Sequence, residues 1–98
     1  MTFADFQNSL QNDSPPAGLA VELKAMWYAG KGEWDASHDL CQESTQALDW
    51  VHAWLHRQEG DLANAGYWYR RANQSMSNGT LEEEWAEISK ALLASADA

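Results

Sequence analysis

Hydrophobic side chains recur along this chain at spacings of three and four residues, and no stretch alternates with the two-residue period of a β-strand. This spacing is typical of amphipathic helices that bury one face. The pattern predicts about six helices, at residues 2–10, 15–29, 33–43, 46–58, 61–72 and from residue 80 onward. Glycine, proline and asparagine stand between the periodic segments, where turns are needed. We therefore expect an all-α protein.

Residues that commonly cap helices stand at several of the predicted starts. Ser14 precedes Pro15, a pair that favours a helix start at that point. Asp61 is placed to cap the fifth segment, and Thr80 with Glu83 has the spacing of a reciprocal capping box. These residues set the expected boundaries of their helices.

The outer segments carry narrower apolar faces than the second segment. Segment 2–10 has Phe3 and Phe6 on one face, as expected for a docking arm. Segment 15–29 is apolar nearly all round, which indicates a central helix with neighbours on both sides. The last segment has a single apolar stripe from Leu81 to Leu92, so we expect a terminal capping helix with one wet face.

An internal repeat becomes visible when the chain is shifted by 28 residues. Gly32 then aligns with Gly60, and the acidic residue that follows each glycine is also matched. Ser37 aligns with Ala65, two small residues that would let helices approach closely. Each copy therefore predicts one helical hairpin whose tight turn contains the glycine.

The second copy, residues 53–72, resembles a tetratricopeptide repeat across its turn and second helix. The positions that match the spaced small and large residues of that family are Gly60, Leu62, Ala65, Tyr69 and Ala72. The first copy departs from the pattern with Ser37, Cys41 and Ser44, and the period is shorter than the usual length of about 34 residues. Residues 51–57 and 67–72 are also similar to a group of small uncharacterised bacterial proteins, a likeness that implies no function.

This resemblance implies two tetratricopeptide-like hairpins with an N-terminal helical arm and a C-terminal capping helix. At 98 residues the chain has room for one core, so we expect a single domain over residues 1–98. The family likeness further implies a protein-protein interaction module, in which the first helix of each hairpin lines a small groove for a peptide or a partner helix.

The net charge of the chain limits the kinds of binding partner that we expect. Fifteen acidic and six basic residues give a formal net charge of −9. Nucleic acids and anionic membranes need clustered Lys and Arg, so we expect neither as a partner. An acidic surface suits a basic protein or peptide. The sequence has no leader-like N-terminus and no apolar run near 18 residues, and its single Cys41 fits a reducing compartment, so we expect a cytoplasmic location.

Tryptophan is unusually frequent, with six in the chain. Large rings bury the most apolar surface per residue, so core filling is the expected role for most of them. One or two remain available to line a pocket or a partner surface, including the contact of a homodimer.

Helical phase places three polar residues on one arc of segment 46–58. Asp49, His52 and His56 lie beside the apolar arc that contains Leu48, Val51 and Leu55. Groups on this arc could bind protons, metals or hydrogen-bonding ligands. We therefore assign the candidate ligand or partner site to Lys24, Tyr28, Asp49, His52, His56 and Arg57.

Three interpretations of the two histidines stay open at the level of sequence. They could be structural, they could bind a hydrogen-bonding small ligand together with Asp49, or they could hold a metal, since imidazoles one helical turn apart can share an ion. His38 and Cys41 lie on another predicted helix and would have to converge with them by packing. We assign no metal and no cofactor on this basis.

Catalysis is the third class of function that the sequence allows. A histidine with a carboxylate can act as general acid and base, with Tyr28 or Arg57 holding an anionic substrate. The chain contains no Gly-rich phosphate loop, nucleophile elbow or metalloprotease motif. We therefore expect a binding protein, either the interaction module or a small-ligand-binding protein, rather than an enzyme.

Overall fold

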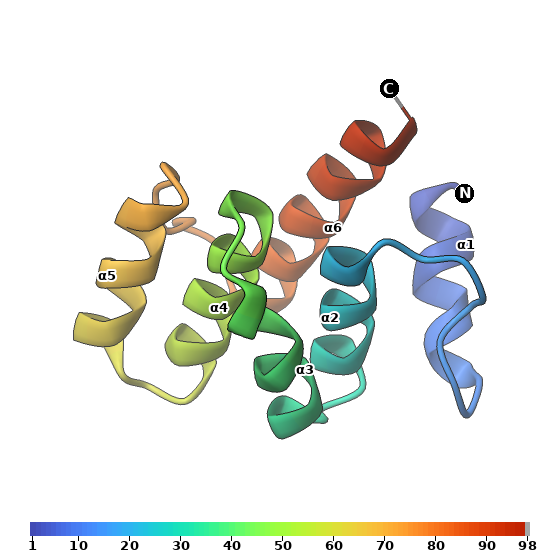
Figure 1. Ribbon diagram of the computed structural model, residues 1–98, viewed down its shortest axis with the longest axis horizontal. Coiled ribbons are helices and arrows are strands. Elements are labelled where there is room, and N and C mark those ends of the chain that lie inside the picture. Colours follow the sequence, from blue (N-terminus) through green and yellow to red (C-terminus); the bar gives the residue numbers. More distant parts are fainter. Residues whose placement is uncertain (98) are drawn as a thin grey trace.

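The computed structural model describes residues 1–97, which form α-helices and short 3-10 turns without any β-strand (Figure 1). The elements are α1 (Phe3–Asn8), η1 (Ser9–Gln11), α2 (Val21–Gly30), α3 (Trp34–Leu40), η2 (Cys41–Glu43), α4 (Gln46–Gln58), α5 (Leu62–Arg71) and α6 (Leu81–Asp97). The predicted all-α class is thus confirmed. None of these helices combines the length and apolar composition needed to cross a membrane.

The helices pack as two sequential pairs with α1 and α6 beside them. Helix α2 packs against α3, and α4 against α5, while α6 contacts α2 and α4. Figure 1 shows α1 and α5 at opposite ends of the molecule, with α2, α4 and α6 between them. The principal extents are 33 × 27 × 27 Å.

Side-chain caps fix several helix starts where the sequence predicted them. The Asp61 carboxylate accepts a hydrogen bond from the backbone N–H of Asn64 at 3.2 Å. Thr80 and Glu83 form the reciprocal capping box, with bonds of 2.9 and 3.0 Å. The hydrogen bond from the Thr80 backbone N–H, followed by that of the Thr80 hydroxyl, lowers the pKa of the Glu83 carboxyl, because these bonds favour its ionised form.

The predicted start of the second helix at Pro15 was wrong. Helix α2 begins six residues later, at Val21, and residues 15–20 are irregular. Pro16 disfavours the helical conformation at Pro15, and Gly18 has φ +81°, outside the right-handed region. Ser14 therefore caps no helix, and the preceding arm is connected to α2 by a non-helical segment.

The two helix pairs share the turn that the repeat predicted. Gly32 and Gly60 have φ values of +79° and +87°, a region that side chains with a Cβ rarely adopt. Ser37 and Ala65, aligned by the same shift, are both buried between the helices of their pair. The turn and the close helix contact thus recur in both copies.

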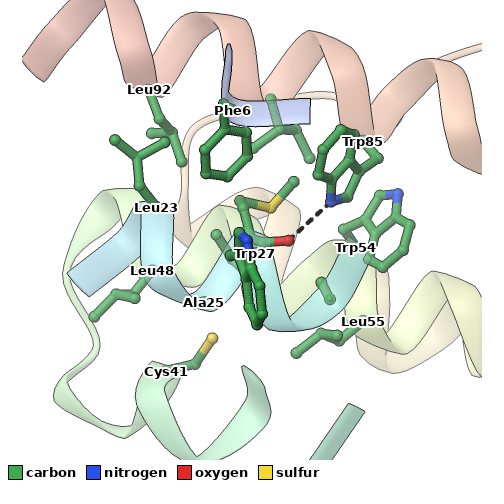
Figure 2. Close-up of a cluster of buried hydrophobic side chains, with 14 of the residues drawn as sticks. Phe6, Leu23, Ala25, Trp27, Cys41, Leu48, Trp54, Leu55, Trp85 and Leu92 are labelled. Atoms are coloured by element: carbon green, nitrogen blue, oxygen red, sulfur yellow. Dashed lines mark hydrogen bonds between the residues drawn. The ribbon is translucent and has the colours of Figure 1, made fainter. Parts of the chain in front are cut away.

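Three tryptophans connect the elements through the core (Figure 2). Their indole N–H groups donate to distant partners: Trp85 to the Met26 carbonyl at 2.9 Å, Trp54 to the Leu81 carbonyl at 3.0 Å, and Trp27 to the Ser9 hydroxyl at 3.2 Å. These rings therefore supply both buried apolar area and directional bonds. The predicted core role is confirmed for them, and the other three tryptophans are half-buried.

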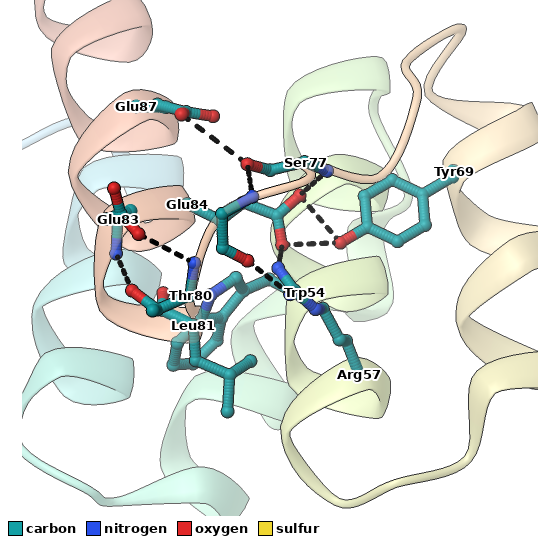
Figure 3. Close-up of polar contacts among 10 residues, drawn as sticks. Trp54, Arg57, Tyr69, Ser77, Thr80, Leu81, Glu83, Glu84 and Glu87 are labelled. Carbon is teal, nitrogen blue, oxygen red and sulfur yellow. Dashed lines mark hydrogen bonds and ion pairs between the residues drawn. The ribbon is translucent and has the colours of Figure 1, made fainter.

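A buried carboxylate attaches α6 to the α4–α5 pair (Figure 3). The Glu84 side chain, 2% exposed, accepts hydrogen bonds from the Tyr69 hydroxyl at 2.7 and 2.8 Å and from Arg57 at 2.9 Å. The backbone N–H of Ser77 donates to it at 3.1 Å. Arg57 also donates to the Gly79 carbonyl at 2.6 Å. Burial, together with the bond to Glu84, raises the pKa of the Tyr69 hydroxyl.

Candidate functional site

All three histidines of the chain converge at one place, although they come from two helix pairs. His38 belongs to α3, whereas His52 and His56 lie one turn apart on α4. The ring centroids are 4.5 Å apart for His38 and His52, 4.8 Å for His52 and His56, and 5.5 Å for His38 and His56. One nitrogen of each ring lies within 4.8 Å of the other two. We refer to His38, His52 and His56 as the histidine cluster.

Trp34 positions the only cluster member that α4 does not carry. Its indole N–H donates to the Leu55 carbonyl of α4 at 2.9 Å, which holds the first turn of α3 against α4. His38 follows one turn later on the same face, and the two rings are stacked with centroids 4.6 Å apart. His38 therefore points toward α4 because Trp34, one turn earlier on the same face, is packed against α4.

A second tryptophan covers the cluster from α5. The Trp68 ring stacks on His52 with centroids 3.9 Å apart and an interplanar angle of 16°. On Trp68 itself lies the Arg71 guanidinium, 5.4 Å from the ring centroid. His52 and His56 are each only 6% exposed, while His38 is half-buried. Trp34 and Trp68 thus each stack on a histidine of the cluster, and Trp34 also packs against the main core.

Burial keeps His52 neutral at physiological pH. Loss of hydration, followed by the repulsion of positive charge on His38 and His56, lowers the pKa of His52 to about 4. Within the described part of the chain its Nδ1 is buried and has no hydrogen-bond partner. A buried polar atom without a partner is uncommon, because burial removes its hydrogen bonds to water and no hydrogen bond within the protein replaces them. His52 therefore retains unused bonding capacity.

His56 is oriented by a carboxylate. Its Nδ1 lies 2.7 Å from the Glu59 carboxylate, so Nδ1 carries the proton and donates it. The lone pair of the neutral ring is then on Nε2. This arrangement, in which a carboxylate fixes the tautomer of an imidazole, is the usual environment of a metal-ligating histidine.

Asp49 does not join the histidines as an additional ligand group, although it shares their face of α4. Its carboxylate, 3% exposed, accepts from the Ser44 hydroxyl at 2.8 Å and lies 3.4 Å from the Arg71 side chain. The third polar group beside His52 and His56 is instead His38. Sequence reasoning named His38 only as a residue that packing would have to bring in.

The other residues of the predicted site lie elsewhere. Lys24 and Tyr28 are half-buried on α2, and no hydrogen bond or ring contact among residues 1–97 connects them to the histidine cluster. Arg57 is bound to Glu84 on a different side of α4. Cys41 is buried, and burial with the nearby charge of Asp49 raises the pKa of its thiol to about 12, which makes it unreactive.

The geometry of the cluster is close to that of a three-imidazole metal site. Metal–nitrogen bonds of 2.0–2.1 Å in a tetrahedral arrangement separate the ligand nitrogens by about 3.3 Å. The observed nitrogens lie within 4.8 Å of one another, so the side chains would have to rotate to bring them to that spacing. Neutral imidazoles suit zinc, copper and nickel, whereas magnesium and calcium prefer oxygen ligands.

No relative was found with which the histidine cluster could be compared. The tetratricopeptide resemblance rests on the spacing of Gly60, Leu62 and Ala65 and on their neighbours in the sequence. Comparisons with protein-family models, with curated proteins and with solved structures found no match to this chain.

Proposed function

We propose that this protein binds a divalent transition-metal ion of the zinc, copper or nickel type through His38, His52 and His56. The observation that carries the proposal is the convergence of all three histidines, from two helix pairs, with one nitrogen of each within 4.8 Å of the others. This is the metal interpretation of the two histidines, to which the sequence alone led us to assign no ion, with His38 in the place considered for Asp49.

The electrostatic surroundings favour a cation at this position. His52 needs no deprotonation at neutral pH, so an ion does not compete with a proton there. His56 lies in the last turn of α4, where the helix dipole places partial negative charge. The net charge of −9 adds a general attraction for cations. An ion bound through His52 Nδ1 would also give this buried nitrogen the partner that it lacks.

A thermal melt with added Zn²⁺ tests this function. An ion that binds only the folded state at one hundred times its Kd adds about 2.7 kcal/mol of stability. For a domain of this size, that corresponds to a rise in Tm of about 10 °C or more. We expect EDTA to reverse the rise. We also expect His38→Ala and the double variant His52→Ala/His56→Ala to show no rise.

The control for this melt is Asp39→Asn, which removes an exposed charge next to His38 on α3 without touching an imidazole. This variant should respond to Zn²⁺ as the parent does. A parent melt that Zn²⁺ leaves unchanged would contradict the proposal. So would a rise that persists after the histidines are removed, because the ion would then be bound elsewhere.

The interaction module is the second candidate, and we propose it together with the tetratricopeptide-like arrangement of α2–α3 and α4–α5. A half-open cavity of about 470 Å³ supports it. Its wall is mainly apolar, with Leu10, Trp54 and Trp85 among the lining residues and no histidine. Such a cavity could accept an apolar side chain of a peptide or partner helix.

A cavity-filling variant tests the second candidate. Ala86 lines the cavity from α6, so Ala86→Trp should occupy the space. A peptide selected from a random library on the parent protein should lose binding to this variant and keep binding to His38→Ala. Equal binding of the peptide to Ala86→Trp and the parent would exclude this cavity as the docking position.

A further inference from the structure

Helix α5 lies at one end of the molecule, where α4 covers one of its sides (Figure 1). Ala65 and Tyr69 are buried on that side. The opposite side carries Ala63, Tyr67 and Arg70, which share one face of the helix because they are three and four residues apart. In the described part of the chain, all three are exposed to solvent. We refer to Ala63, Tyr67 and Arg70 as the α5 outer face.

Tyr67 is the large apolar side chain of this face, and its ring is already held in place. The side chain is 45% exposed. Its ring is perpendicular to that of Trp68, with centroids 5.0 Å apart, and its hydroxyl accepts a hydrogen bond from Arg71 at 3.3 Å. A ring that is ordered before binding loses little conformational entropy when a partner covers it. Tyr67 is therefore suited to the centre of an interface.

The two ends of α5 carry opposite charges. Glu59 and Asp61 stand at its N-terminal end, whereas Arg70 and Arg71 lie in its last turn. Arg71 is paired with Asp49, but among residues 1–97 Arg70 has no ion pair. A helix with an acidic start and a basic end is complementary to a second copy of itself that runs in the opposite direction.

One antiparallel register of two copies satisfies both the ring and the charges. Its two-fold axis is level with position 65. Tyr67 and Ala63 are each two residues, about 3 Å, from that level, so Tyr67 of one copy faces Ala63 of the second, whose small side chain leaves room for the ring. Arg70 is five residues from the axis and therefore faces position 60 of the second copy, which lies between Glu59 and Asp61. The symmetry repeats each contact.

We propose that this protein forms a homodimer through the α5 outer face, with the two α5 helices antiparallel and Tyr67 at the centre. The inference does not depend on metal binding. A helix of 10 residues is about 15 Å long, so the interface is small, below about 1,200 Å² in total. The net charge of −9 on each copy also opposes association. We therefore expect a dimer that dissociates readily and forms at high protein concentration.

Sedimentation equilibrium in the presence of EDTA, so that metal ions play no part, tests the association. The average mass should rise from that of one chain toward that of two between about 10 µM and 1 mM protein, where weak complexes become populated. Tyr67→Glu should weaken the association about tenfold or more, because the central ring is lost and the new carboxylate lies near Asp61 of the second copy. A parent mass that stays that of one chain up to about 1 mM would overturn the proposal.

Val21→Glu is the matched control for this variant. Val21 is also an exposed apolar side chain, 39% exposed, but it stands at the start of α2 in the other helix pair. The control has the same net charge as Tyr67→Glu, so it reproduces any general repulsion between two copies. Val21→Glu should associate nearly as the parent does. Equal weakening by the two substitutions would assign the effect to net charge and contradict a contact at Tyr67.

Disulfide trapping tests the direction and register of the two helices. Ala63→Cys and Tyr67→Cys are prepared separately, mixed in equal amounts and oxidised. The antiparallel register predicts that the mixed disulfide, between positions 63 and 67, forms faster than the disulfide of either variant with itself. The natural Cys41 does not compete, because it is only 1% exposed. If disulfides between identical variants form as fast as the mixed one, the proposed arrangement is overturned.

Discussion

Helix α4 contributes side chains to two buried polar clusters that use their bonding capacity differently. At Glu84, both carboxylate oxygens are occupied by Tyr69, Arg57 and a backbone N–H (Figure 3). In the histidine cluster, rings contact rings, and within the described residues the His52 Nδ1 has no partner at all. When every donor and acceptor of a buried network has a hydrogen-bond partner, none is free to bind a ligand. A buried network that has an atom without a partner can still bind one.

The contrast is sharpest at two adjacent residues. His56 and Arg57 follow one another in α4 and therefore point in directions about 100° apart. Arg57 binds Glu84 and holds α6, while His56 faces the other histidines and α5. One residue serves the fold and the next serves the candidate site, so the two roles can be separated by mutation.

Removal of Glu84 should have the largest effect on stability. We expect Glu84→Ala to lower the free energy of unfolding by about 3–5 kcal/mol, because it leaves Arg57 largely buried without its charge partner. In the metal-free protein, His38→Ala should cost less than about 1 kcal/mol, since the ring is half-exposed. Urea denaturation measures both. Similar losses in the two variants would remove the distinction between the clusters.

Acid should destabilise the metal-free protein through His52. The pKa of its ring is about 4 in the folded protein, against about 6.5 in an unfolded chain. Between these values only the unfolded chain binds the proton, so the free energy of unfolding falls as the pH is lowered from about 6.5 to 4. The full effect is about 3 kcal/mol at most.

Urea midpoints at a series of pH values, compared between the parent and His52→Gln, isolate this contribution from that of the carboxylates. The parent should lose stability more steeply than the variant over the window. Parallel curves would mean that the His52 ring is protonated as easily in the folded protein as in the unfolded one. The cluster would then not be the desolvated site described above.

Local signals in the sequence predicted most helix boundaries. The caps at Asp61 and Thr80 and the turns at Gly32 and Gly60 depend on nearest neighbours, which a sequence displays directly. The start of α2 was missed because Pro15 is favourable at a helix start only when the next residues can continue the helix. Pro16 and Gly18 prevent that continuation.

The sequence predicted only those histidines of the candidate site that lie together on one helix. His52 and His56 follow from their spacing on α4, but His38 depends on how α3 is packed, which the bond from Trp34 to the Leu55 carbonyl determines. A usable signal was the spacing of Trp34 and His38, which puts both on one face of α3. Asp49 was assigned to the site because helical phase does not show that Ser44 and Arg71 already bind its carboxylate.

Nuclear magnetic resonance of the histidine side chains tests the central claim most directly. The chain has three histidines, so a spectrum that correlates ring protons with ring nitrogens contains three sets of signals, one for each member of the cluster. We expect one equivalent of Zn²⁺ to shift the signal of one ring nitrogen in each of His38, His52 and His56 together. Shifts confined to the half-exposed His38, or no shift in any ring, would contradict it.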